Sequence, residues 1–167
     1  PISATNGVRV GNGAAGTLTV STGGALNMTG GLLSVGLNAS GNGTLNINGG
    51  SIANGEALRL GFNGATGTLS ITNGGTLVTS SSTVTSNTIG DGSGASPATG
   101  IMTISGAGSS WTIGQGALVL GSGADSLGRL TITDGGKLSY QNANGAVIVG
   151  YLGGTGEVLV SGANSLF

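Results

Sequence analysis

Two aspartates are the side chains in this chain whose type and spacing could do chemistry. Asp91 and Asp125 follow the glycines Gly90 and Gly121, in what we expect to be the same corner of two adjacent structural repeats. Two carboxylates about 5–10 Å apart could serve as the pair of a glycosidase or as oxygen ligands for Ca²⁺. We nevertheless expect both to be solvated turn residues, because the chain has five carboxylates in all and no histidine.

The rest of the composition excludes several other kinds of chemistry. The 167 residues include 38 glycines and four basic side chains, and there is no cysteine. Disulfides and thiolate metal sites are therefore excluded, and a net charge of −1 provides no basic surface for nucleic acid. No apolar run approaches the roughly 20 residues of a membrane-spanning helix. The sequence predicts no enzymatic activity, no cofactor and no metal site.

Three short apolar segments recur six times along the chain, and these elements must position every other side chain. In each segment apolar and polar residues alternate, as in a strand whose successive side chains face opposite sides. The first segment of each repeat ends in a glycine: Gly11, Gly36, Gly61, Gly90, Gly121 and Gly150. These glycines are 25, 25, 29, 31 and 29 residues apart.

The repeats predict an all-β fold, a right-handed parallel β-helix (β-solenoid) of about six rungs with three short strands each. A single rung cannot bury its inward side chains, whereas rungs stacked about 4.8 Å apart bury them in continuous columns. The predicted columns are Val10–Val35–Leu60–Ile89–Leu120–Val149, Leu18–Leu45–Leu69–Met102–Leu130–Val158 and Leu26–Ile52–Leu77–Trp111–Leu138–Leu166. We expect one domain over residues 1–167, with an irregular insertion around residues 78–99 that forms an extra strand or surface loops.

Several other side chains have expected places in this fold. Trp111 should pack in the core, and Arg129 and Glu157 should form a surface pair in one outward column. Asn48, Asn73 and Asp134 precede glycine corners and should hydrogen-bond along the stack. An outward apolar row is expected to allow lateral packing between solenoids. The row comprises Val119, Ile148 and Leu159.

The two ends of the chain predict how copies could meet. Residues 1–7 form a polar lead-in, and the last residues begin another apolar segment. Phe167 lies 17 residues after Gly150, so continuing into residue 11 of another copy gives a glycine spacing of 28, within the internal range. Either copies stack head to tail, or the chain is one unit of a longer tandem array, or the lengths match by chance. The predicted interface is Pro1, Ile2, Val8 and Val10 at one end and Val158, Val160, Leu166 and Phe167 at the other.

Three segments share a pattern that goes beyond periodicity: residues 35–50, residues 60–77 and residues 105–111. In this pattern the chain resembles the passenger repeats of autotransporter-type (type V secretion) and PEP-CTERM-associated bacterial surface proteins. The resemblance implies a β-solenoid that is extracellular or at the bacterial cell surface and is adhesive or structural.

A self-assembling structural protein is the function that the sequence favours. Its copies would build an extracellular filament or surface layer by β-augmentation, in which unpaired backbone groups at one end bind the next strands. The main alternative is a fragment of an autotransporter-like adhesin passenger that binds a host or matrix ligand along one face. A polysaccharide-active enzyme that uses Asp91 and Asp125 is a third hypothesis.

Overall fold

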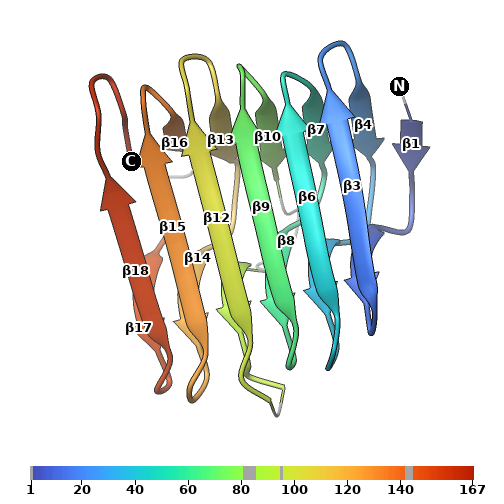
Figure 1. Cartoon of the computed structure of the whole chain (residues 1–167), viewed down its shortest axis with the longest axis vertical. Coiled ribbons are helices and arrows are strands. Elements are labelled where there is room, and N and C mark those ends of the chain that lie inside the picture. The colour runs from blue at the N-terminus through green and yellow to red at the C-terminus, as the bar shows by residue number, and fades with distance from the viewer. Residues whose placement is uncertain (1, 81–85, 95, 142–144) are drawn as a thin grey trace.

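The computed structural model describes residues 2–80, 86–94, 96–141 and 145–167, and it confirms the predicted β-solenoid. The strands form three parallel six-stranded sheets, here named A, B and C, in which neighbouring strands come from successive repeats. Figure 1 shows the repeats side by side in chain order, with the two termini at opposite ends of the stack. Over the described residues, no helix is long and apolar enough to cross a membrane.

Each rung contributes one strand to each sheet. Sheet A consists of β1 (Ile2–Ala4), β4 (Ala25–Met28), β7 (Ser51–Asn54), β10 (Thr76–Thr79), β13 (Ser110–Ile113) and β16 (Lys137–Tyr140). Sheet B consists of β2 (Val8–Asn12), β5 (Leu33–Leu37), β8 (Leu58–Phe62), β11 (Asn87–Asp91), β14 (Leu118–Ser122) and β17 (Val147–Tyr151). Sheet C consists of β3 (Ala15–Ser21), β6 (Asn42–Asn48), β9 (Thr66–Thr72), β12 (Thr99–Ser105), β15 (Leu127–Thr133) and β18 (Thr155–Val160). Rung 1 is thus β1–β3 and rung 6 is β16–β18.

The core is the set of inward columns that the repeats predict. The strand registers align the predicted members from Val10 to Val149 in sheet B and from Leu18 to Val158 in sheet C. In the middle rungs Leu60, Leu69 and Trp111 are completely buried. The indole Nε1–H of Trp111 donates a hydrogen bond of 3.0 Å to the Thr79 hydroxyl, which is also buried. The predicted core position of Trp111 is confirmed.

The corner between sheets B and C depends on the repeated glycine. Gly61 and Gly121 have φ values of 69° and 64°, in the left-handed region that glycine adopts readily. A Cβ on Gly61 would collide with the carbonyl oxygen of Thr99 in the next rung, and one on Gly121 with that of Thr155. The glycine column therefore lets successive rungs approach to sheet spacing at this corner.

Polar side chains form short ladders on the outside of the stack, as predicted. The amide of Asn73 donates to the Asn48 side-chain oxygen at 2.6 Å. Arg129 Nε lies 2.6 Å from the Glu157 carboxylate, and this hydrogen bond raises the pKa of Arg129 and lowers that of Glu157. Both side chains of the ion pair are exposed, so solvent screens it and it adds little to stability.

Two segments differ from, or extend beyond, the sequence prediction. Residues 1–7 are not only a polar lead-in, because Ile2–Ala4 forms β1 and pairs in parallel with β4. In the irregular insertion, β10 ends at Thr79 and β11 begins at Asn87. The predicted extra strand or loop between them falls mainly on residues 81–85, which lie outside the described residues.

Candidate functional site: the two open ends

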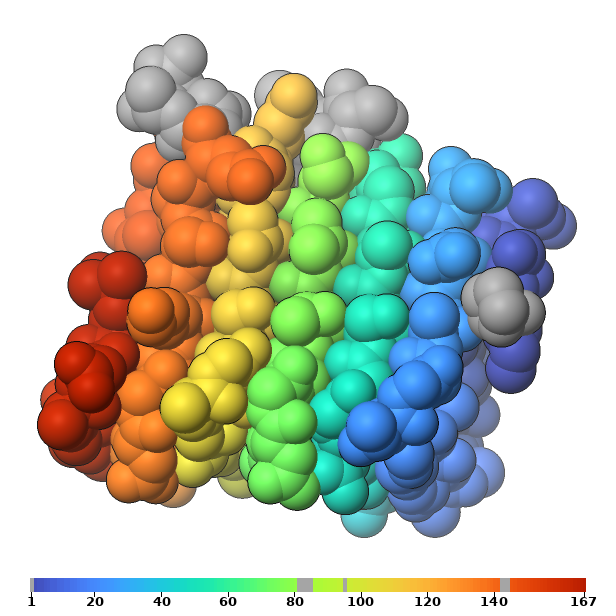
Figure 2. Space-filling model, turned by 90° about the horizontal axis from the view of Figure 1, so that it is seen from above, coloured from blue at the N-terminus to red at the C-terminus, as the bar shows by residue number. Residues whose placement is uncertain are grey.

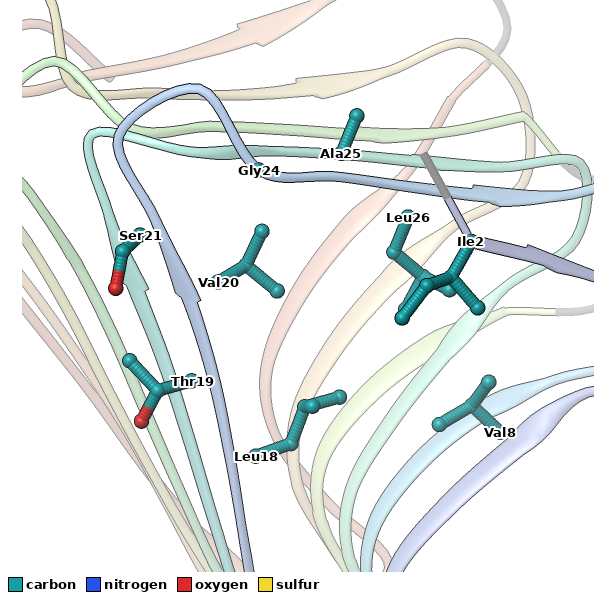
Figure 3. A pocket seen from close by; sticks show the side chains of 9 residues that line it. All are labelled: Ile2, Val8, Leu18, Thr19, Val20, Ser21, Gly24, Ala25 and Leu26. Atoms are coloured by element: carbon teal, nitrogen blue, oxygen red, sulfur yellow. The ribbon is translucent and has the colours of Figure 1, made fainter.

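The N-terminal end of the solenoid is an apolar hollow. Its volume is about 400 Å³, and its apolar lining comes from all three strands of rung 1 and from β4. Figure 3 shows Ile2, Val8, Leu18, Val20 and Leu26 around one common space, whereas Thr19 and Ser21 point away from it. The alternation of each strand thus places its apolar residues where a preceding rung would cover them.

The C-terminal end of the solenoid exposes the same kind of side chain. Inward residues of β17 and β18 that would be covered by a seventh rung are 36–49% exposed: Val147, Val149, Val158 and Val160. Leu166 and Phe167, which follow β18, are 55% and 45% exposed. Within the stack the corresponding columns are fully buried, so exposure here results from position and not from residue type.

The backbone is open at both ends as well. β2 and β17 are the two edge strands of sheet B, and β3 and β18 are those of sheet C. An edge strand leaves a row of N–H and C=O groups free to pair with another strand. Each end therefore combines apolar side chains with unpaired backbone groups.

The two ends match each other in sheets B and C. The column that starts at Val10 ends at Val149, and the column that starts at Leu18 ends at Val158. A second copy placed one rung spacing, about 4.8 Å, beyond β17 and β18 would continue both columns. Figure 2 shows the rungs as successive layers, with rung 1 and rung 6 at the two faces that such a contact would join.

Sheet A corrects one position of the sequence prediction. Leu166 pairs with Lys137, and not with Leu138 as its predicted inward column requires. The N–H of Leu138 donates to the Leu166 carbonyl at 2.9 Å, and the N–H of Leu166 donates to the Gly136 carbonyl at 3.1 Å. The register shifts because the corner from Val160 to Leu166 is one residue longer than the corner from Ile132 to Lys137.

This shift makes the two ends overlap in sheet A. Phe167 follows Leu166 and is therefore in line with Leu138, in the column that also contains Leu26 and its partner Ile2. In a head-to-tail stack, Phe167 of one copy and Ile2 of the next would be assigned to the same position. Only one of the two segments can occupy it.

The predicted interface residues lie at the two ends, with different exposure. Ile2 is exposed and Val8 is half-buried, but Val10 is buried within rung 1. Pro1 lies outside the described residues. The sequence prediction omitted several residues that share these surfaces. Those residues are Leu18, Val20 and Leu26 at one end and Val147 and Val149 at the other. Their positions in the same alternating segments were the signal that could have included them.

The two candidate aspartates do not occupy equivalent positions. Asp91 ends β11 in register with Ser122, whereas Asp125 lies beyond β14 with a φ of 58°. The expectation of a solvated turn residue is correct for the exposed Asp125 and wrong for Asp91, which is 8% exposed. Asp91 is buried because it belongs to a strand that is covered by its neighbours. Its Oδ1 accepts a hydrogen bond of 3.0 Å from the Ser93 N–H.

The predicted outward apolar row is also only partly exposed. Val119 is buried, Ile148 is half-buried and Leu159 is 55% exposed. Val119 faces outward as predicted, but it forms part of a hollow on sheet B and is covered by the side chains around it. The row is therefore not one continuous apolar surface.

Comparison of the chain with models of protein families, with curated proteins and with solved structures found no match. The arrangement itself is therefore the basis for a functional proposal. Among the described residues there is no group of three or more histidine, cysteine, aspartate or glutamate side chains that could hold a metal ion.

Proposed function

We propose that this chain is a structural building block of an extracellular fibre or surface layer at a bacterial surface, and that its copies stack head to tail. The observation that carries the proposal is that the columns of the middle rungs lead to an apolar hollow at one end and to exposed valines at the other, and that the two ends are in register with each other in sheets B and C. The bacterial surface is part of the proposal because of the resemblance of the repeats to surface-protein passengers.

The mechanism is β-augmentation between copies. Strands β2 and β3 of one copy pair with β17 and β18 of another, and the hollow around Leu18 and Val20 receives Val158 and Val160. Val158 and Val160 are 36% and 41% exposed, so covering each of them contributes only part of the roughly 1.5–3 kcal/mol gained by burying a fully exposed side chain of this size. Because the two surfaces are different and the contact displaces each copy by one solenoid length along the same axis, the contact does not close into a ring and repeats into a filament.

Electron microscopy and light scattering of the purified chain test the proposal. Rods whose width matches one solenoid, and a scattering mass that rises with protein concentration, are expected. A monodisperse particle of about one chain mass over the same concentrations, with no rods in the images, would overturn it.

Gly150 offers a variant that separates stacking from folding. Its φ is 76°, but a Cβ there would meet nothing in this chain closer than the Gly154 carbonyl oxygen at 3.3 Å. In a stack, Gly150 would have the first rung of the next copy beside it, as Gly121 has rung 6 beside it within the chain. A Cβ on Gly150 would then collide with the Ala15 carbonyl oxygen of the next copy. Gly150→Ala should fold with a modest backbone penalty of about 1–2 kcal/mol and should fail to form rods.

Gly153→Ala is the matched control. Gly153 lies in the same rung and has a φ of 83°, so alanine causes comparable backbone strain. A Cβ on Gly153 would lie 3.4 Å from the Cα of Ala124 in the preceding rung. This contact is within the chain and away from the open face. Circular dichroism should show that both variants fold. Electron microscopy should show rods only for Gly153→Ala. Rods of equal length from Gly150→Ala would contradict this stacking geometry.

A further inference from the structure

The contact in sheet A is a place where a head-to-tail stack cannot keep both of its ends as they are in the free chain. Residues 166–167 lie beside β16, and residues 2–4 lie beside β4. In a stack with one rung spacing between copies, both segments are assigned to the single position between β16 of one copy and β4 of the next. One of them must therefore leave its place when two copies join.

Strand β1 is held in this position by a short contact. It has three residues, and it pairs with β4 on one side only. Ile2 is its inward apolar residue and borders the hollow together with Leu26 (Figure 3). Ile2 is nevertheless 70% exposed, so less than a third of its surface is covered. Release of β1 therefore gives up little apolar burial and the pairing of three residues.

The C-terminal segment is attached more firmly, through the corner that precedes it. The Ser165 hydroxyl donates to the Ser161 carbonyl at 2.6 Å and accepts from the Gly135 N–H at 3.1 Å. Leu166 makes two further backbone hydrogen bonds with the chain around the start of β16. Moving this segment would break its backbone bonds and disturb the corner that Ser165 holds.

The place of β1 also suits Leu166 and Phe167 better than it suits β1. Both residues would be in register with the first two residues of β4 in the next copy, because the same columns run from β4 to β16. This inward column already accommodates a large ring within the chain, since Trp111 belongs to it and is completely buried. Phe167 has a larger side chain than Ile2 and would bury more apolar surface in the same position.

We propose that head-to-tail joining is a strand exchange in sheet A, in which residues 166–167 of one copy replace β1 of the next. This inference rests on the proposed function and identifies the segment that takes the place of Ile2 at the N-terminal hollow. In the free chain β1 covers the edge of β4, and covering an edge strand is a known protection against unwanted pairing. Each new contact between copies therefore requires the release of one β1.

A disulfide that locks β1 onto β4 tests the exchange. Ser3 and Asn27 are register partners with exposed side chains, and partners on adjacent strands lie about 4.8 Å apart, which suits a disulfide. The chain has no cysteine, so Ser3→Cys with Asn27→Cys introduces a single bond. The bond is formed at a dilution where the chain is monomeric and is verified by mass spectrometry. It should abolish rods in electron microscopy, and reduction should restore them.

The matched control places the same bond elsewhere in the same outward column. Thr112 and Ser139 are register partners of β13 and β16, and their hydroxyl oxygens lie 3.2 Å apart. Thr112→Cys with Ser139→Cys should form its disulfide equally well. Rods should be unchanged in the oxidised and the reduced form, because β13 and β16 stay paired in a stack.

Two single substitutions provide a second readout, the protein concentration at which light scattering detects rods. Ile2→Ser weakens the hold of β1 and leaves Phe167 intact, so this concentration should fall about threefold. Phe167→Ala shrinks the incoming side chain and should raise the concentration about tenfold. Both residues are partly exposed in the free chain, so circular dichroism should show that both variants fold.

Two results would overturn the exchange while rods of the parent chain still support stacking. One is that the oxidised chain with Ser3→Cys and Asn27→Cys forms rods as readily as its reduced form. The other is a concentration that rises for Ile2→Ser and falls for Phe167→Ala, as expected if β1 keeps its place and the C-terminal segment leaves. Absence of rods from the parent chain itself would instead overturn the stacking, and the exchange with it.

Discussion

The middle rungs and the end rungs of this solenoid are built from the same sequence pattern but have different surroundings. Leu69 in rung 3 and Val158 in rung 6 belong to the same inward column of sheet C. Leu69 is completely buried, whereas Val158 is 36% exposed. The difference shows that at the C-terminal end the missing next rung leaves an inward side chain exposed, because the rungs contact one another mainly in sequence along the stack.

The end rungs also differ from each other. Rung 1 presents a hollow lined by side chains that converge, and its Val10 is buried. Rung 6 instead presents partly exposed valines on the inward side of its strands, together with the exposed Leu166 and Phe167. Because the columns of one end are in register with those of the other in sheets B and C, a head-to-tail contact continues them.

The largest effect on stability should come from truncating a side chain of the same sheet C column, once in a middle rung and once in the last rung. Leu69→Ala leaves a cavity between two covering rungs and should lower the free energy of unfolding by about 3–5 kcal/mol. Val158→Ala, in the same column but partly exposed, should cost less than about 1 kcal/mol. Denaturant unfolding monitored by circular dichroism, at concentrations where the chain is monomeric, measures both. Equal losses would show that rung 6 is already covered in solution.

A smaller effect should come from the one indole of the core. Trp111→Phe removes the donor to the buried Thr79 hydroxyl and should lower the free energy of unfolding by about 2 kcal/mol, partly from the unpaired hydroxyl. The double variant Trp111→Phe, Thr79→Val should recover part of that loss, because both hydrogen-bonding partners are then gone. If the two substitutions are simply additive in thermal unfolding, the hydrogen bond contributes nothing to the stability of the middle rungs.

The smallest effect on stability near neutral pH should come from Tyr140, which ends β16, the first strand of rung 6. Its hydroxyl donates to the carbonyl oxygens of Gly116 at 3.1 Å and Ala146 at 3.3 Å, and burial raises the pKa of Tyr140 to about 12. An unfolded tyrosine titrates near pH 10, so the folded state retains the proton to higher pH. The stabilisation is therefore complete below about pH 10 and is lost as the pH rises towards 12.

Absorbance titration of the phenolates and thermal unfolding between pH 8 and 12 measure this effect. Tyr140→Phe should remove the late phenolate transition and most of the dependence of the melting temperature on pH above about 10. A Tyr140 that titrates near pH 10 in the folded chain would mean that the corner at rung 6 is as open as the end itself.

The sequence predicted the middle of the molecule well and its margins less well. Alternation placed Leu60, Leu69 and Trp111 in the core, because a period of two assigns each strand residue to a face. It did not reveal that Asp91 and Val119 are buried on the outer face, since that depends on which side chains lie in the adjacent rungs. It missed β1 at Ile2–Ala4, because three residues are too few to show a period.

By itself the sequence determined the stack: three alternating segments per repeat and a glycine at each sheet B corner leave few folds other than a solenoid. The sequence also predicted which residues share the inward columns, apart from Leu166. Only the tertiary structure decided the register of that last segment and the surroundings of the outward side chains. The one-residue shift of Leu166 and the overlap of Phe167 with Ile2 both follow from that register. The physical reason is that alternation fixes the face on which a side chain lies, whereas corner length and the neighbouring rungs fix what it meets there.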